Sequence, residues 1–179
     1  MNKKVGIEWL GVVCIFGLLL YFESVVHTKL LSCLPHKNGN FVHFLNISGK
    51  IRIFFTHIIY YIMLTTLLHI LSVIINPEIE TDYPKLLRKI GLCFSVFLLP
   101  AILNFININD MVATLEKSEN VIKKMKTMKR GFLIDILNII LIMCSTVYTK
   151  KYYKLSFINS LLVGGVTILI FTLLSTIIT

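Results

Sequence analysis

Residues 155–178 read LSFINSLLVGGVTILIFTLLSTII, a run of apolar and small polar residues without a single charge. A helix needs about 20 residues to cross the roughly 30 Å hydrocarbon core of a bilayer, because each residue rises only 1.5 Å. The run meets that length, and a helix satisfies every backbone amide internally where no water is present. It therefore predicts a membrane-spanning helix.

Four further apolar runs come near the same length, at residues 5–26, 51–75, 90–108 and 132–148. The second of them is ended by Asn76-Pro77, since proline lacks the amide donor that a helix interior requires. Aromatic residues lie near the ends of the runs, as in the aromatic belts of membrane proteins. The sequence thus predicts one all-α domain over residues 1–179, a polytopic membrane bundle of about five transmembrane helices.

The composition excludes an ordinary soluble domain. Hydrophobic residues make up 56% of the 179-residue chain, the mean hydropathy is +0.82, and only 15% of residues are charged, against about a quarter in soluble proteins. The net charge of +9 is spread over every connecting segment and forms no basic stripe, which favours anionic lipid headgroups over nucleic acid as the counter-charge. We expect a multi-pass protein of the cell membrane, with lipids as partners and no nucleic acid.

The connections are expected at residues 29–50, 76–89, 109–130 and 149–154. The third interleaves apolar residues with lysines, which fits either a short amphipathic helix on the membrane surface or a solvated, partly helical loop. With a cytoplasmic amino terminus, eight Lys and Arg residues fall inside and ten outside. The positive-inside rule thus mildly opposes that orientation.

Histidine and cysteine spacing predicts no metal site. His57 and His69 share one apolar run but lie about 18 Å apart along a helix, too far for one ion. His27, His36 and His43 fall in the first connection without a zinc-site spacing and are interpreted as solvated loop residues. For His69, a polar residue within a span, a structural hydrogen bond to another helix is favoured over catalysis. The cysteines, Cys14, Cys33, Cys93 and Cys144, are interpreted as small apolar fillers.

A few polar residues in the spans are candidates for function. Asp135 lies in the first turn of the fourth run, where helix-dipole stabilisation is favoured over proton transfer. Pro100 frees a backbone carbonyl in the third run, and Asn104 and Asn107 follow it, so that the three predict a polar notch between helices.

Other residues of the spans are given structural roles. A contact of Glu8 with Lys3 or Lys4 would be enough to explain an acidic residue in the first run. For Glu23, near the end of that run, the same two roles stay open, a structural contact or proton transfer. Gly164 and Gly165 permit close helix approach. The sequence has no nucleophile elbow, P-loop or paired intramembrane aspartates, and we expect no catalytic residue, cofactor or metal.

Two stretches resemble the bacterial branch of the Yip1 family of five-helix membrane proteins. Residues 81–91, TDYPKLLRKIG, lead into FSVFLLPAILNFI, similar to that family's basic lead-in and proline-containing helix. Residues 131–174, GFLIDILNIILIMCSTVYTKKYYKLSFINSLLVGGVTILIFTLL, are similar to its aspartate-led fourth helix, basic turn and apolar last helix. The soluble amino-terminal region of the eukaryotic members is absent, and Cys144-Ser145 replaces an expected small residue. The resemblance implies a cytoplasmic amino terminus and a non-enzymatic accessory role beside an ABC-type exporter.

Three functions remain open from the sequence. The preferred one is a non-catalytic accessory or scaffold protein that packs against a transporter subunit, another membrane protein or itself. A small permease or channel subunit would use Asp135, His69 and the notch from Pro100 to Asn107. An immunity-type membrane protein is a further alternative, and an intramembrane enzyme ranks last.

Overall fold

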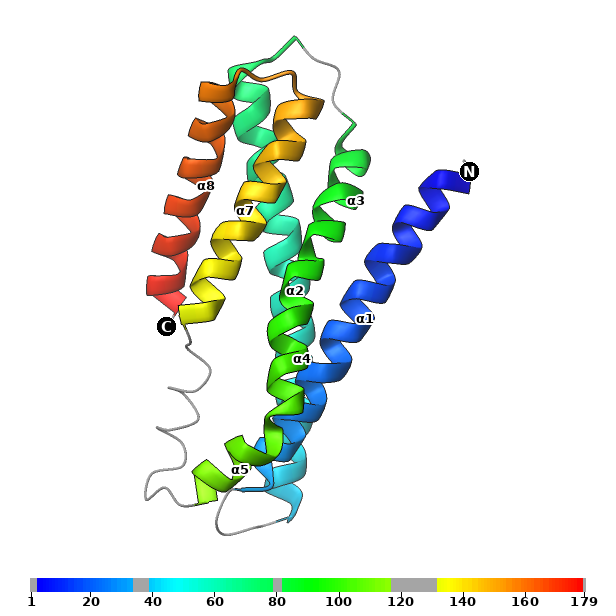
Figure 1. The fold of residues 1–179 in the computed structure, drawn as a ribbon, viewed down its shortest axis with the longest axis vertical. Helices are drawn as coiled ribbons and strands as arrows, with labels where there is room; N and C mark the ends of the chain where they lie inside the picture. Colours follow the sequence, from blue (N-terminus) through cyan, green and yellow to red (C-terminus); the bar gives the residue numbers. More distant parts are fainter. Residues whose placement is uncertain (1–2, 34–38, 79–81, 117–131, 179) are drawn as a thin grey trace.

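The computed structural model describes the backbone of residues 3–33, 39–78, 82–116 and 132–178, and their side chains apart from residues 3, 116, 132–138, 171, 172 and 174–178. Within these ranges the chain is helical and contains no strand. The helices run antiparallel along one long axis (Figure 1). In chain order they are α1 (Lys3–Leu31), α2 (Gly39–Ile75), α3 (Tyr83–Cys93), the 3-10 turn η1 (Phe94–Phe97), α4 (Leu98–Ile106), α5 (Ile108–Glu116), α7 (Phe132–Tyr152) and α8 (Phe157–Ile178).

The all-helical class predicted from the sequence is confirmed for the described residues, and the helix count differs. With α3, η1 and α4 taken as one continuous segment, the described part holds six helices where five were expected, because α5 is an additional short one. Within the part of the chain that the structure describes, three helical segments are long and apolar enough to span a membrane: Lys4–Leu31, Gly39–Ile75 and Tyr83–Ile106.

The connection predicted at residues 29–50 is shorter in the structure, because both flanking helices extend into it. α1 continues to Leu31 and α2 already begins at Gly39. Side chains in the extensions bond across the hairpin: the Thr28 hydroxyl donates to Asn46 Oδ1 at 3.0 Å. Both helices therefore continue beyond their apolar runs, where side chains of α1 and α2 contact each other.

The third helical segment begins at Tyr83, seven residues before the predicted start at Ile90. Its start follows from local chemistry: the Asp82 carboxylate accepts a hydrogen bond from the Lys85 amide at 3.1 Å, and Pro84 occupies the first turn, where no amide donor is needed. The η1 turn lies just before Pro100. Proline cannot bond to the carbonyl four residues earlier, that of Val96 within η1, and its ring crowds that carbonyl.

The helices pack closely where glycine faces a neighbour. A Cβ on Gly91 of α3 would lie 2.9 Å from both methyl groups of Val12 on α1, and one on Gly11 would lie 3.0 Å from Leu92 Cδ2. These reciprocal contacts bring the backbones of α1 and α3 together. The largest apolar cluster lies beside this crossing and gathers residues of α2, α3, α7 and α8 around the fully buried Phe94.

α7 and α8 form a tight antiparallel hairpin. Lys154 adopts a positive φ of 47°, and the Leu155 amide donates to the Lys150 carbonyl at 3.2 Å. This bond over five residues is the helix-ending motif that usually places glycine at the left-handed position. The hairpin packs against α2 and α3, with its turn at the same end of the molecule as the carboxyl end of α2 (Figure 1).

The predicted surface segment at 109–130 is described only in part. α5 buries Ile108 and Leu115 against Val26 and Leu30 of α1, so this stretch packs on protein. The rest of the segment, with all its lysines, lies outside the described residues.

Candidate functional site

Polar side chains gather at the end of the bundle formed by the first half of α1, the carboxyl end of α2, the start of α3 and the α7–α8 turn. They form two groups, which we name the ion cluster (Glu8, Arg88 and Lys89) and the tyrosine–histidine cluster (Thr66, His69, Asn76, Tyr83 and Tyr153). Each group joins elements that are far apart in the sequence.

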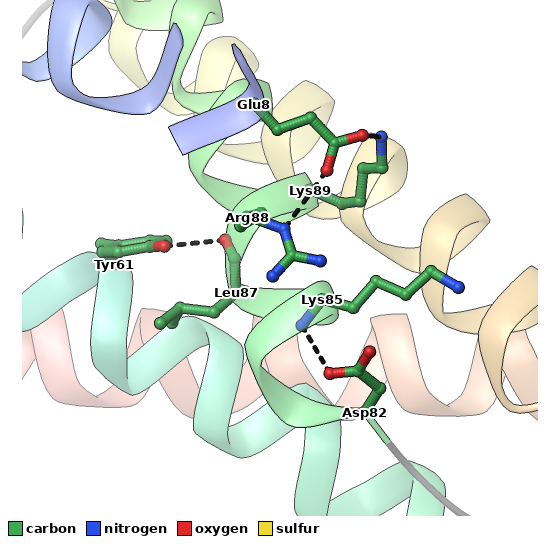
Figure 2. Close-up of polar contacts among 7 residues, drawn as sticks. All are labelled: Glu8, Tyr61, Asp82, Lys85, Leu87, Arg88 and Lys89. Carbon is green, nitrogen blue, oxygen red and sulfur yellow. Dashed lines mark hydrogen bonds and ion pairs between the residues drawn. The ribbon is translucent and has the colours of Figure 1, made fainter. Parts of the chain in front are cut away.

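The ion cluster connects α1 to α3 (Figure 2). Glu8 Oε1 lies 2.5 Å from Lys89 Nζ and its Oε2 lies 3.2 Å from Arg88 Nε. The Glu8 side chain is 15% exposed and that of Arg88 10%. These two partners of Glu8 come from α3 and lie 80 and 81 positions away in the sequence. Local spacing, which suggested Lys3 or Lys4, cannot predict contacts over that distance.

The tyrosine–histidine cluster joins α2 to the α7–α8 turn. The Tyr153 hydroxyl is hydrogen bonded to His69 Nδ1, and the Asn76 side-chain amide donates to the Tyr153 carbonyl at 3.1 Å. The rings of Tyr83 and Tyr153 both lie against the His69 ring, with centroids 5.1 and 5.8 Å away. His69 therefore makes the structural contact between helices that the sequence favoured.

Tyr153 is the buried centre of this cluster, with 2% of its surface exposed. Burial, helped by the charges of Tyr83 and Asp82, raises the pKa of its phenol from 10.0 to about 12. A phenol is protonated at neutral pH in any case, and the raised pKa extends the range in which this hydroxyl can hydrogen bond with His69 to more alkaline pH.

The surface of this end is basic and aromatic. Lys85 Nζ lies 4.9 Å from the centre of the Tyr152 ring, and Lys150 Nζ lies 5.1 Å from that of Phe157. Such contacts hold ammonium groups beside amphipathic rings, an arrangement typical of a membrane–water interface.

The other candidate residues belong to neither the ion cluster nor the tyrosine–histidine cluster. Asn104 of α4 and Asn107, which follows that helix, are exposed, and Pro100 is half-buried. The polar notch between helices stays a prediction from the sequence. Asp135 belongs to the first turn of α7, and its side chain lies outside the described residues.

For the α1–α2 hairpin, the sequence leaves the role of Glu23 open and predicts His27 and His43 in a loop. Glu23 pairs with His57 at 3.4 Å between α1 and α2. His27 and His43 lie on helices and not in a loop, and His36 falls outside the described residues. Two histidines thus make contacts between α1 and α2. His57 pairs with Glu23, and His27 Nε2 lies 3.4 Å from the Leu45 carbonyl.

Sequence reasoning missed Arg88, Lys89 and Tyr153 because it assigned them to connections. A usable signal was present at residues 82–84, Asp-Tyr-Pro, which is a helix start. It places Arg88 and Lys89 in the second turn of a helix, next to the buried Leu86 and Ile90.

Comparisons with models of known protein families, with curated proteins and with solved structures find no match. The resemblance to the Yip1 family remains an expectation from the sequence.

Proposed function

We propose that this chain is a multi-pass protein of the cell membrane that acts as a non-catalytic accessory or scaffold subunit for another membrane protein. In this proposal α1, α2, the α3–α4 segment, α7 and α8 are five crossings. α7 and α8 have 21 and 22 residues, about 32 Å of helix, which matches the hydrocarbon core. Their packing alongside α2 and α3 supports their inclusion.

The proposal rests chiefly on how the polar and apolar side chains are distributed. The ion pairs and the tyrosine–histidine cluster join one helix to another, and are thus used to hold the bundle together. The outward faces carry large exposed apolar side chains, among them Leu10, Ile59, Leu99 and Leu161, each more than half exposed. Apolar surface of this extent suits lipid and a membrane partner.

A transport pathway is less well supported by the same distribution. His69 bonds at the end near the α7–α8 turn, whereas Asn104 of α4 and Asn107 are exposed. Polar groups that line a pathway are expected to face the bundle interior or a water-filled cavity. An accessory role requires no such alignment, and the family resemblance points to an exporter as the partner.

Crosslinking in the native membrane, followed by purification in mild detergent, tests the accessory role. We expect one membrane protein, such as a transporter subunit, to copurify in a fixed ratio. A tagged unrelated polytopic protein of similar abundance is the control. Recovery of the chain alone, with nothing trapped by the crosslinker, contradicts the proposal.

A further inference from the structure

Arg88 is a nearly buried cation whose hydrogen-bonding capacity is only partly used. Its side chain is 10% exposed, and a guanidinium carries five N–H donors. Among the described residues, its hydrogen-bond and ion-pair partner is Glu8, which bonds to Nε at 3.2 Å. The two terminal nitrogens point away from the Glu8 carboxylate, toward the first turn of α3 (Figure 2). Neither terminal nitrogen is among the buried polar atoms of the described residues that lack a partner, so both are accessible to an acceptor from outside the chain.

The charges around Arg88 leave a positive excess. Glu8 is shared between Arg88 and Lys89, so one carboxylate faces two cations. Lys85 lies one turn before Arg88 on α3, is exposed, and has no carboxylate partner among the described residues; its ammonium rests by the Tyr152 ring. The nearest acidic residue along the helix, Asp82, uses its carboxylate to cap the α3 amide of Lys85.

The position of these cations matches the headgroup level of a bilayer. Tyr83, Tyr152 and Tyr153 lie at this end, together with Lys150, Lys151 and Lys154 of the α7–α8 turn. Basic pockets between helices at this depth recognise phosphate-bearing lipid headgroups. The planar fork of an arginine suits a phosphate, which accepts two parallel hydrogen bonds.

We propose that Arg88 and Lys85 bind the phosphate of an anionic phospholipid headgroup, between α3 and the carboxyl end of α7. Arg88 supplies its two terminal nitrogens and Lys85 its ammonium, while Glu8 holds Arg88 through Nε. The inference rests on the membrane location proposed above and is independent of the accessory role.

Native mass spectrometry of the full chain in detergent, titrated with phosphatidylglycerol or phosphatidylcholine, tests this site. We expect phosphatidylglycerol to bind about tenfold more tightly than phosphatidylcholine. Lys85→Gln should weaken phosphatidylglycerol binding about fivefold, and Arg88→Gln should abolish the preference. The matched control is Lys154→Gln, which removes the same charge from the same end without changing Arg88 or Lys85, and should bind as the parent does.

Several outcomes would overturn the site. The first is unchanged phosphatidylglycerol binding in Arg88→Gln. If that variant does not fold, unchanged phosphatidylglycerol binding in Lys85→Gln would overturn the site instead. An equal loss in Lys154→Gln would show a diffuse charge effect. Competition by millimolar inorganic phosphate as effective as by the lipid would assign the site to a soluble anion. If phosphatidylcholine still binds in any of these cases, the phosphate site is wrong but the proposed membrane location is not contradicted.

Discussion

At the scale of single residues, Glu8 is the side chain through which α1 is tied electrostatically to α3. Replacing it by glutamine leaves Arg88 and Lys89 without their carboxylate while keeping the shape. We expect Glu8→Gln to lower the free energy of unfolding by about 1–3 kcal/mol. Thermal unfolding followed through Trp9, the single tryptophan and the next residue along α1, measures the effect.

The control for this substitution is Glu23→Gln at the other end of α1. Its carboxylate faces His57 at 3.4 Å and is 34% exposed, so the loss should be smaller. The exchange Glu8→Lys with Lys89→Glu should recover part of the stability that Glu8→Lys alone removes. Unfolding of Glu8→Gln at the same temperature as the parent would show that the cluster contributes no stability.

Tyr153 makes stability depend on alkaline pH. Its pKa is raised from 10.0 to about 12 in the fold, so the folded state holds the proton more tightly than the unfolded one. Stability is complete below about pH 10 and is lost as the pH rises toward 12. The loss attributable to Tyr153 should reach about 1.4 kcal/mol near pH 11.

Tyr153→Phe isolates this contribution, because it removes the phenol and keeps the ring. At neutral pH we expect it to cost about 1 kcal/mol through the lost hydrogen bond with His69. The gap in unfolding free energy between parent and variant should then close above about pH 10 and reverse near pH 11, in unfolding curves recorded by circular dichroism. A gap that stays constant from neutral to alkaline pH would exclude this role of the phenol.

At the scale of elements, two adjacent glycines of α8 should behave differently. A Cβ on Gly164 would lie 2.6 Å from Thr146 Oγ1, and Thr146 is fixed by its bond to the Ile142 carbonyl at 2.7 Å. A Cβ on Gly165 meets nothing within 4 Å. We expect Gly164→Ala to destabilise the α7–α8 hairpin by about 1–3 kcal/mol.

The neighbouring Gly165→Ala is the internal control for that substitution. It should be neutral or stabilise by up to about 1 kcal/mol, since alanine favours a helix more than glycine does. Thermal unfolding of both variants in the same detergent decides the point. Equal stability of the two would mean that α7 does not pack on the Gly164 face.

The elements also show what the sequence could and could not predict. The end of α2 at Ile75 follows from the Asn76-Pro77 signal and was predicted. The hairpin extensions of α1 and α2 were missed, since residues 27–31 and 39–50 are stabilised by contacts with each other. α3 was predicted to begin too late because its charged turn was taken for a loop.

The candidate site was predictable only in part, for the same physical reason. His69 was identified because a polar residue inside an apolar run is conspicuous. Its partner Tyr153 lies 84 residues away, and the pairing depends on the α7–α8 hairpin packing beside α2. Asn104 and Asn107 have suitable spacing, yet only the fold determines that they are exposed.

At the scale of the whole molecule, the arrangement of the helices places the α7–α8 turn beside the connection between α2 and α3. If five segments cross the membrane, this turn and Asp82 lie on one side and the α1–α2 turn on the other. If only the three longest segments cross, the α7–α8 turn lies on the side of the α1–α2 turn. The location of this one turn therefore distinguishes the two topologies.

The most direct measurement is labelling of single cysteines in sealed, oriented vesicles with a membrane-impermeant maleimide. The four free cysteines are first replaced by serine, and a cysteine is then placed at the exposed Ser32, Asp82 or Lys151. We predict that Asp82→Cys and Lys151→Cys react from the same side and Ser32→Cys from the opposite one. Reaction of Lys151→Cys together with Ser32→Cys, or of all three from one side, would contradict the five-crossing arrangement.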